Sequence, residues 1–374
     1  MRSATRRSEV MWIRRSPRRR GFRIRAAYEA ARSAEANMKR LIRWAVLALA
    51  CGGCAAGGPR TASLAMMTGA ADELRVHFID VGQGDCTLIE CPGGGVILVD
   101  CGSLGGGDKD RVKAYIRERL DASAPRIDTL ILTHPDADHY NLLDDVLDGV
   151  TVGNILMTGT SDEYSSDDFA AWLDDHESIV KRLGPTDFDT TDGEPKFCDC
   201  GDAQVRILAA DVAATASPTN ARSIVALVQY EDFDVLLTGD ATFDTENVIL
   251  ERYDQAWLEC EVLKIGHHGS ETTSTSQAWA AAISPDAAVV SAGYSNRFAH
   301  PRKKVIQRLM PFTVTEDAHP MRWGWSEGTA AKFENLPDFT EAIYSTATNG
   351  NIVVSSDGSE YAIVFDQRAQ TRRR

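Results

Sequence analysis

The most constraining feature of this sequence is a cluster of two histidines and two aspartates that directly follows an apolar run. In chain order its members are His134, Asp136, Asp138 and His139. The preceding run, 127–132, has the apolar composition of a buried strand. Imidazole nitrogens and carboxylate oxygens bind divalent ions of the zinc and manganese type, and a turn after a strand can direct them to one point. The cluster therefore predicts a metal site at the end of a strand.

Two later apolar runs also end in residues that bind metals. The run 235–238 leads to Asp240, and the run 262–265 leads to the pair His267 and His268. Apolar strands whose polar residues lie at one edge are the way in which an α/β sheet forms a site. We therefore expect three strand ends to contribute to a single centre.

The order of these motifs resembles the metallo-β-lactamase fold, and in particular the C-terminal domain of the ComEC family of DNA-uptake competence proteins. Further agreement lies in segments 78–85, 97–102, 220–223 and 291–301, and the resemblance covers roughly residues 74 to 365. It implies an α/β fold, a metallo-β-lactamase-like αββα sandwich of two mixed sheets flanked by helices. Apolar periodicity predicts alternating strands and helices over this region, including a helix at 166–183.

The resemblance also implies two divalent ions, either zinc or manganese, with magnesium as an alternative. The first site has His134, but Asp136 stands where the general family pattern has a second histidine. No histidine between His176 and His267 supplies a third. We expect this site to be rich in oxygen ligands and open. Such ligands favour manganese or magnesium over zinc alone.

The second site is expected to be more complete. Its ligands are Asp138, His139, Asp240 and one histidine of the pair at 267 and 268. In this arrangement Asp240 bridges both ions. We assign His268 as the ligand and leave His267 to contact substrate, although the reverse assignment fits the sequence as well.

Phosphodiester hydrolysis is the chemistry that such a pair of sites suits. Two ions that share a carboxylate make a water between them more acidic and stabilise charge on the attacking and leaving oxygens. The resemblance places His300 near the leaving group, where an imidazole can donate a proton; the alternative is a structural histidine that caps a helix beginning near Pro301. The residues expected to act in catalysis are Asp138, His267 and His300. The residues expected to hold the metal loops through hydrogen bonds are Asp80, Gln83 and Asp85.

Charge argues against a long polyanionic substrate. The chain has a formal net charge of −14, and residues 1–60 hold 15 basic and 3 acidic residues, which leaves −26 on residues 61–374. An acidic surface repels nucleic acid at long range. A local basic groove would have to come from Lys264, Arg297, Arg302, Lys303 and Lys304.

Three functions therefore remain open. The resemblance implies a nuclease with DNA as its substrate. Composition favours a hydrolase of another phosphodiester, in an envelope polymer or a lipid headgroup. The alternative of a different class is a surface binding protein that uses the fold without turnover.

The N-terminal region predicts export. Residues 1–37 are basic, and we interpret them as sequence upstream of the true start. Residues 38–51 have the basic and apolar parts of a bacterial lipoprotein leader, with Cys51 as the lipidated residue. Cys54, or an ordinary cleaved signal peptide, is the alternative. Such a protein is periplasmic or extracellular and contacts the membrane only through a lipid anchor.

The rest of the chain predicts one free-standing domain. Residues 52–72 are expected to form a flexible tether, and the hydrolase domain spans 73–368 with an insertion at 311–345. No apolar run after residue 60 approaches the ~20 residues of a membrane-spanning helix. No protein partner is predicted.

Export would allow disulfides. Cys86 and Cys101 lie symmetrically about a turn at 93–94, so a hairpin would place them opposite each other. The thiols of Cys198 and Cys200 are expected on one face of a strand. The sequence assigns no partner to Cys91 and Cys260.

Overall fold

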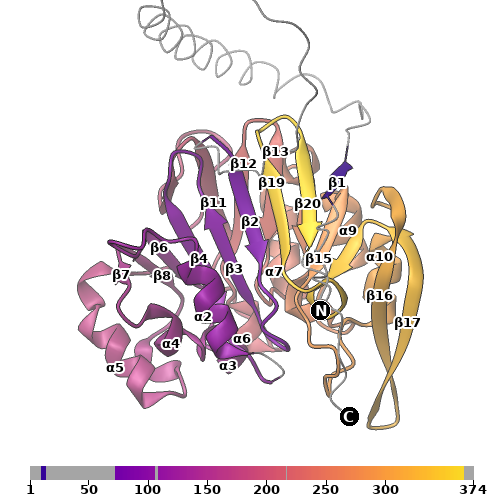
Figure 1. Ribbon diagram of the computed structural model, residues 1–374, viewed down its shortest axis with the longest axis horizontal. Coiled ribbons are helices and arrows are strands. Elements are labelled where there is room, and N and C mark those ends of the chain that lie inside the picture. Colours follow the sequence, from indigo (N-terminus) through magenta and orange to yellow (C-terminus); the bar gives the residue numbers. More distant parts are fainter. Residues whose placement is uncertain (1–9, 14–71, 106–107, 216, 366–374) are drawn as a thin grey trace, which may run out of the picture. The chain divides into compact units, whose positions relative to one another are not determined.

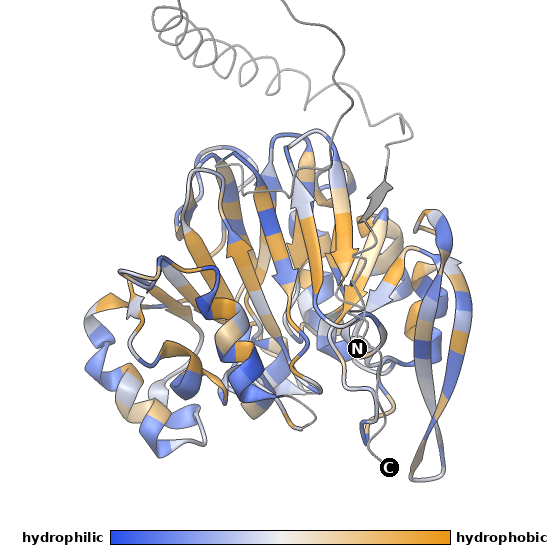
Figure 2. Ribbon diagram, viewed as in Figure 1, coloured by the Kyte–Doolittle hydropathy of each residue, from blue (hydrophilic) through white to orange (hydrophobic). Residues whose placement is uncertain are grey.

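Two mixed β-sheets lie at the centre of the molecule, and helices flank them (Figure 1). The computed structural model describes residues 10–13, 72–105, 108–215 and 217–365. The inner faces of the two sheets share one cluster of buried apolar side chains, with Phe78 and Ile89 from one sheet and Val228 and Val235 from the other. Figure 2 shows hydrophobic stretches, in orange, along the strands. This is the sandwich that the sequence predicted.

The first sheet is antiparallel on one side and parallel on the other. Strands β4, β6, β8 and β9 run parallel, and the remaining neighbours pair antiparallel. In spatial order its strands are β1 (Val10–Ile13), β20 (Tyr361–Phe365), β19 (Ile352–Ser356), β2 (Leu74–Phe78), β3 (Cys86–Glu90), β4 (Val96–Cys101), β6 (Thr129–Leu132), β8 (Ile155–Met157) and β9 (Val180–Arg182). The pair β5 (Arg126–Ile127) and β7 (Thr151–Val152) stands beside it.

The second sheet is also antiparallel on one side and parallel on the other. Strands β13, β14, β15 and β18 run parallel, so their carboxyl ends meet at one edge. In spatial order its strands are β10 (Cys198–Cys200), β11 (Ala203–Ala209), β12 (Val225–Tyr230), β13 (Phe233–Leu237), β14 (Val262–Lys264), β15 (Ala287–Val290) and β18 (Ile343–Ser345).

Helices pack on the outer face of each sheet through separate apolar clusters. Those on the first sheet are α2 (Lys109–Arg117), α4 (Leu143–Leu147) and α5 (Asp167–Asp175). Those on the second are α7 (Phe243–Arg252), α9 (Gln277–Ile283) and α10 (Lys303–Leu309). Short helical segments lie in the connections: α3 (Ala137–Tyr140), η1 (Ser161–Glu163), η2 (Glu177–Ile179), α6 (Pro218–Ala221), α8 (Gln255–Leu258), η3 (Gly266–Gly269) and α11 (Thr346–Asn349).

The helix expected over 166–183 ends at Asp175. Residues Val180–Arg182 instead form β9, which pairs parallel with β8. The β-branched residues Ile179 and Val180 pack against the outer cluster at that edge, and β-branched side chains favour a strand where a partner strand is available. Tertiary pairing therefore overrides the helical periodicity.

Segment 311–345 forms two different structures. Strands β16 (Thr315–Glu327) and β17 (Ala330–Glu341) make a long antiparallel hairpin, while β18 joins the second sheet. Buried Met321, Trp323 and Phe339 fix the hairpin to the cluster around α10. In Figure 1 the hairpin stands beside α10 and extends toward the end of the fold where α3 and α6 lie.

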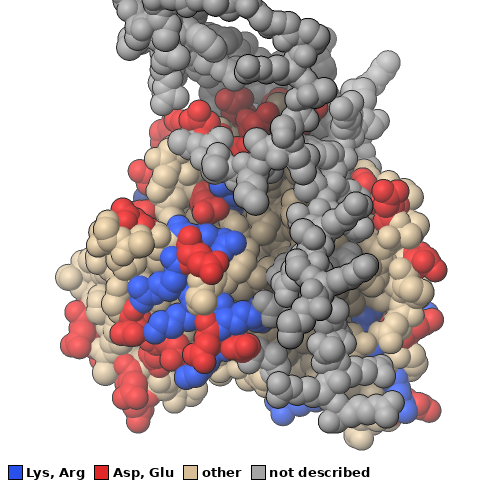
Figure 3. Space-filling model, in the orientation of Figure 1, with Lys and Arg blue, Asp and Glu red and all other residues tan. Residues whose placement is uncertain are grey.

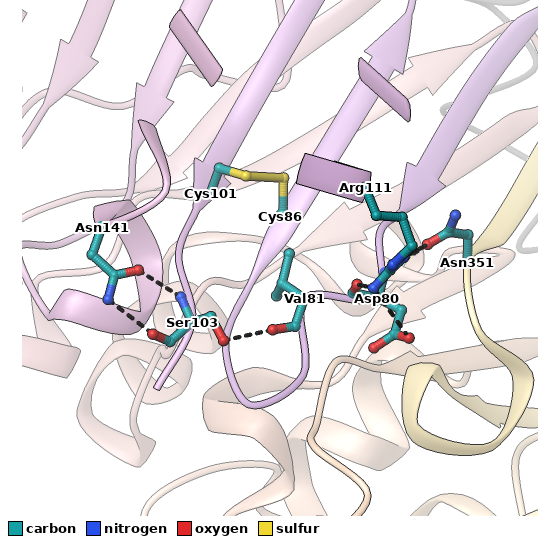
Figure 4. The surroundings of a disulfide bond; sticks show 8 residues. All are labelled: Asp80, Val81, Cys86, Cys101, Ser103, Arg111, Asn141 and Asn351. Carbon is teal, nitrogen blue, oxygen red and sulfur yellow. Dashed lines mark hydrogen bonds and ion pairs between the residues drawn. A yellow bond between two sulfur atoms is a disulfide. The ribbon is translucent and has the colours of Figure 1, made fainter. Parts of the chain in front are cut away.

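Two disulfides stabilise the first sheet and its junction with the second. Cys86 and Cys101 are opposite each other in the β3–β4 register and are bonded, as predicted (Figure 4). Cys91 bonds to Cys200 of β10, 109 residues away; a separation this long gives no sequence signal. Cys198, which shares a strand with Cys200, is buried and unbonded within the described chain.

The N-terminal predictions lie almost entirely outside the described residues. These are the basic segment 1–37, the leader 38–51 and the tether 52–72, of which the structure describes 10–13 and residue 72. Within the part that is described, no helix combines the length and the apolar character needed to cross a bilayer.

Candidate metal centre

Three loops that follow buried strands bring the predicted metal ligands together. The loop after β6 carries residues 134–139, the loop after β13 carries Asp240, and the 3₁₀ segment η3 after β14 carries His267 and His268. The strands supply rigid, apolar supports, and their polar ends converge from both sheets. The arrangement is the one that the sequence predicted.

Asp240 lies at the centre of this cluster. Its Oδ1 is 3.3 Å from His139 Nε2, and its Oδ2 is 3.5 Å from His268 Nε2. His268 Nε2 is also 3.3 Å from Asp138 Oδ2. Ligand atoms of His134, His139 and Asp240 lie within 4.8 Å of one another, and the same limit holds for Asp138, His139 and His268. The carboxylate of Asp240 thus stands between two groups that can each hold an ion.

Buried atoms without hydrogen-bond partners mark the same place. Among the described residues, these include His139 Nε2, His268 Nε2 and Asp240 Oδ1. Buried polar atoms in proteins are nearly always satisfied, and here an imidazole nitrogen and a carboxylate oxygen face each other at 3.3 Å. A divalent cation would satisfy both. The residues therefore fit the metal that the motifs predict.

Outer residues orient the imidazoles so that Nε2 points inward. His268 Nδ1 donates to the carbonyl of Ser291 at 2.9 Å. His139 Nδ1 is 2.7 Å from Asp100 Oδ2, and Asp100 also accepts from the amide and hydroxyl of Thr133 at 2.8 and 2.6 Å. Hydrogen bonds of this kind fix the tautomer of metal-binding histidines. Asp100 was missed as a functional residue, although the motif 97–102 contains it.

The electrostatics of the centre favour a cation. Burial alone would raise the pKa of Asp240, but the imidazoles of His268 and His139 hold it well below its usual range. Burial would likewise lower the pKa of His139, yet Asp240 and Asp100 raise it well above its usual range. Burial would raise the pKa of Asp138, but the imidazole of His268, 3.3 Å away, outweighs it, and the pKa falls to about 2. Without metal, protons on the imidazoles balance the carboxylates, and ions would displace those protons.

Asp136 lies at the outer side of the centre. Its side chain is 42% exposed, and its Oδ2 is 3.5 Å from His134 Nε2. The amide nitrogen of Asn220 lies 3.2 Å from Asp136, 3.4 Å from His134 and 3.4 Å from Asp240. Rotating this amide by 180° would present its oxygen instead. Asn220 therefore stands where the sequence leaves a gap in the first site.

Lys264, a candidate for a local basic groove in the sequence, does not lie at the surface. It is 3% exposed, forms an ion pair with buried Asp85, and donates to the carbonyl of Gly239 at 3.1 Å. Asp85 in turn lies within 4.8 Å of Asp240 and His268 ligand atoms. The pattern of an apolar strand around Lys264 could have indicated burial, but not its partner. Lys264 thus supplies a fixed positive charge next to the centre.

The other residues expected to hold the loops do so at different places. Gln83 Oε1 accepts from the amide of Gly293 at 3.1 Å, which joins two loops. Asp80 lies 3.5 Å from Arg111 and accepts from the amide of Gly82, outside the cluster (Figure 4).

His267 and His300 lie on one side of the cluster, next to a pocket. His267 Nε2 is 3.7 Å from Asp240 Oδ2, and its Nδ1 is 2.8 Å from the hydroxyl of Thr273. The ring of His300 is 6.1 Å from that of His267 and 6.4 Å from that of His268. His268 Nε2 approaches both Asp138 and Asp240, whereas His267 approaches only Asp240. The geometry is compatible with His268 as the ligand and His267 as a substrate contact.

The order and spacing of these residues identify a known family. The model of the metallo-beta-lactamase superfamily matches residues 79–294, more than half of the chain. The chain belongs to this superfamily. The matched region contains every residue of the cluster, whereas His300 lies just beyond it.

Curated relatives are competence and recombination proteins. ComE operon protein 3 of Bacillus subtilis (strain 168) is 27% identical over 266 residues, which is 65% of this chain and 31% of that protein. Recombination protein 2 of Haemophilus influenzae is 28% identical over 241 residues, covering 63% and 26%. Competence protein ComA of Neisseria gonorrhoeae is 27% identical, covering 64% and 30%. The chain thus spans about a third or less of the length of these relatives.

Among solved structures, the chain is similar to two further proteins at low sequence identity. The metallo-beta-lactamase fold protein YhfI from Bacillus subtilis aligns with a TM-score of 0.39 at 12% identity, covering 65% of this chain and 94% of that one. A diphosphatase from the PhnP family aligns with a TM-score of 0.34 at 12% identity, covering 71% and 99%.

Proposed function

We propose that this protein is an exported hydrolase of phosphodiesters that holds two divalent metal ions. The observation that carries the proposal is the convergence of buried, unpartnered ligand atoms from His139, His268 and Asp240. Superfamily membership adds that such centres commonly serve hydrolysis. The proposed ligands are His134, Asp136, Asp138, His139, Asp240 and His268.

Charge balance favours two ions over one. Five carboxylates surround the centre, and one buried ammonium, that of Lys264, lies among them. With neutral imidazoles this leaves a formal charge of minus four, which two divalent ions neutralise. A single ion would leave an uncompensated negative charge in a buried place, which is costly. The carboxylates are those of Asp85, Asp100, Asp136, Asp138 and Asp240.

Bound divalent ions at such a centre make a water more acidic and attract charge that develops on phosphate oxygens. The chain's own residues orient the side chains that would hold the ions. Asp240 stands between the two groups, Asp100 accepts from His139 Nδ1 and so directs His139 Nε2 at the centre, and Asp138 lies 3.3 Å from His268 Nε2. Buried His300 lies beyond them, and its Nδ1 is unpartnered among the described residues.

His300 needs the substrate before it can donate a proton. Burial lowers its pKa, and the neighbouring charges of His268 and His267 lower it further, to about 3. The side chain is therefore neutral near pH 7 and can hydrogen-bond to a phosphate oxygen. The negative charge of a bound phosphodiester beside it would favour the charged form, so we propose that His300 acts as a donor only when substrate is bound.

The test combines metal content with hydrolysis. Wild-type protein should bind close to two ions of manganese or zinc per chain and hydrolyse bis(p-nitrophenyl) phosphate. Asp240→Asn keeps the shape of the side chain but removes its charge, so it should lose both bound ions and turnover. Asp80→Asn is the matched control, because Asp80 lies outside the cluster. Retention of ions and turnover in Asp240→Asn, or no turnover by wild type loaded with two ions, would overturn the proposal.

Export is supported by the two disulfides. Cys86–Cys101 and Cys91–Cys200 would form in an oxidising compartment and rarely in a reducing cytoplasm. We propose lipid attachment at Cys51, so mass spectrometry of the native protein should find an N-terminus at Cys51 carrying acyl chains. An intact N-terminus at Met1 in the cytoplasmic fraction would contradict this.

Nucleic acid is the first substrate to test, because curated relatives are competence and recombination proteins. An envelope phosphodiester is the rival. A screen with DNA, RNA and glycerophosphodiesters distinguishes the two, and binding without cleavage of any of them would favour the non-catalytic function.

A further inference from the structure

A pocket of about 290 Å³ opens on the His267 side of the metal centre. It is bounded by η3 and the residues after it on one side and by the loop before α10 on the other. Its lining residues are His267, Ser270, Glu271, Thr272, Thr273, Phe298, His300 and Arg302. Since His267 Nε2 is 3.7 Å from Asp240 Oδ2, a group bound here would lie next to a phosphate at the centre.

The lining offers three kinds of contact. Phe298 presents a partly exposed aromatic ring, which stacks at 23° on the ring of His300 with centroids 5.5 Å apart. Arg302 presents a guanidinium at the same wall. The opposite wall carries hydroxyls, and its carboxylate, Glu271, is 3.6 Å from Lys304. An aromatic face, a cation and several hydroxyls together suit a planar heterocycle joined to a phosphate.

The pocket is held in shape before any ligand arrives. Asn296 accepts from the amide of His300 at 2.9 Å and donates to its carbonyl at 2.7 Å. Arg302 donates to Ser326 of β16 at 2.7 Å, and the amide of Gly324 donates to the carbonyl of Pro301 at 2.8 Å. The hairpin therefore supports the wall that carries Phe298 and Arg302, and a preformed wall reduces the entropy lost on binding.

We propose that this pocket binds one nucleoside next to the phosphate at the metal centre. The base stacks on Phe298, and Arg302 contacts the phosphate. A volume of about 290 Å³ lies at the lower end of the range for small-ligand sites and accommodates one such group rather than a run of them. The inference rests on the proposed phosphodiester hydrolysis and specifies the substrate side of it.

Binding of products tests the pocket independently of turnover. Calorimetry on the metal-loaded protein should give a tighter dissociation constant for adenosine 5′-monophosphate than for methyl phosphate, which has the phosphate without the base. Stacking on one aromatic side chain contributes about 1–3 kcal/mol, or roughly a 5- to 150-fold preference. Phe298→Ala should abolish this preference and leave methyl phosphate binding unchanged.

Three further variants make the test sharper. Phe298→Leu keeps an apolar side chain without an aromatic face and should also lose the preference. This second variant keeps the test valid if the alanine variant does not fold. Trp325→Ala is the control, because Trp325 is 41% exposed on β16 but does not line the pocket. Arg302→Gln should weaken both ligands to a similar degree.

The outcomes separate the two proposals. Equal binding of both ligands by wild type, or a preference that survives in both Phe298 variants, overturns the nucleoside pocket even if phosphodiesters are hydrolysed. A preference that depends on Phe298 supports the pocket even if no phosphodiester is hydrolysed, in which case the proposed function fails alone. Loss of the preference in Trp325→Ala would place the stacking on the hairpin and overturn the assignment to Phe298.

Discussion

Asp100→Asn is the substitution that most directly tests how the centre is organised. Asp100 Oδ2 lies 2.7 Å from His139 Nδ1 and 2.6 Å from the hydroxyl of Thr133, while Oδ1 accepts from the amide of Thr133 at 2.8 Å. Each of these hydrogen-bond partners is thus a donor. Asp100 has a φ of 54°, which asparagine tolerates well, so the backbone should not change.

An amide cannot satisfy these donors. If its nitrogen faces His139, two donors meet, and His139 must move its proton to Nε2, the atom proposed to bind metal. If its nitrogen faces the amide of Thr133, a buried donor is left unsatisfied, which costs about 1–3 kcal/mol. Loss of such an orienting partner lowers metal affinity by about 10- to 100-fold, equivalent to about 1.4–2.8 kcal/mol.

Equilibrium dialysis with zinc and manganese measures the effect directly. Asp80→Asn is the matched control, with the same atoms exchanged at an aspartate outside the cluster. Circular dichroism confirms that each variant is folded. An affinity for both ions within about twofold of wild type in folded Asp100→Asn would refute the orienting role, since the tautomer of His139 would then not depend on Asp100.

The remaining predictions concern stability. Replacing Cys91 and Cys200 by alanine opens a loop of 109 residues and should lower the free energy of unfolding by about 5 kcal/mol in the chain-entropy model, measured by guanidinium unfolding; a loss below about 1 kcal/mol would contradict it. Burial raises the pKa of Glu246 from 4.5 to about 7, although the backbone donors around it act in the opposite direction. The unfolded chain therefore releases this proton at a lower pH than the folded chain does. The free energy of unfolding should fall by about 3 kcal/mol as the pH rises from 4.5 to about 7. Glu246→Gln should flatten that pH dependence, and an unchanged slope would assign it to other groups. Lys264→Met leaves buried Asp85 unpaired and should cost about 3–5 kcal/mol in metal-free protein, with manganese restoring part of it; a thermal unfolding curve like that of wild type would show that the pair is not needed.

The sequence predicted which strands deliver the ligands, because the chemistry is local. Each of His134, Asp240 and His268 follows an apolar run of strand length by a few residues, and parallel strands of one sheet must end at the same edge. The predicted convergence required only that the two sheets pack face to face. The 3.3 to 3.5 Å distances around Asp240 are the result.

Residues that act through long-range contacts were not predictable in the same way. Lys264 lies in an apolar strand, and only the fold reveals that Asp85, in the loop before β3 of the other sheet, comes within ion-pair distance. Asp100 is the penultimate residue of β4 and looks like many other aspartates, yet its backbone has a left-handed φ and its carboxylate lies against His139. Cys91 and Cys200 are joined only because β10 reaches the turn after β3. Periodicity carries no information about such pairs.

Charge and pocket shape together restrict the substrate. A long polyanion needs a row of cations along its path. Of the five basic residues that could form such a row, Lys264 is buried against Asp85, and Lys303 and Lys304 form ion pairs with glutamates.

Basic residues elsewhere follow the same pattern. On α2, Lys109 and Lys113 pair with Asp145 and Asp148, and Figure 3 shows basic and acidic side chains interspersed over that face. Arg302 is the predicted groove residue that lines the pocket, beside Phe298. Recognition that relies on one lining cation and one aromatic ring favours a short or terminal phosphodiester over the interior of a long strand, because each further phosphate of a long strand needs a cation of its own.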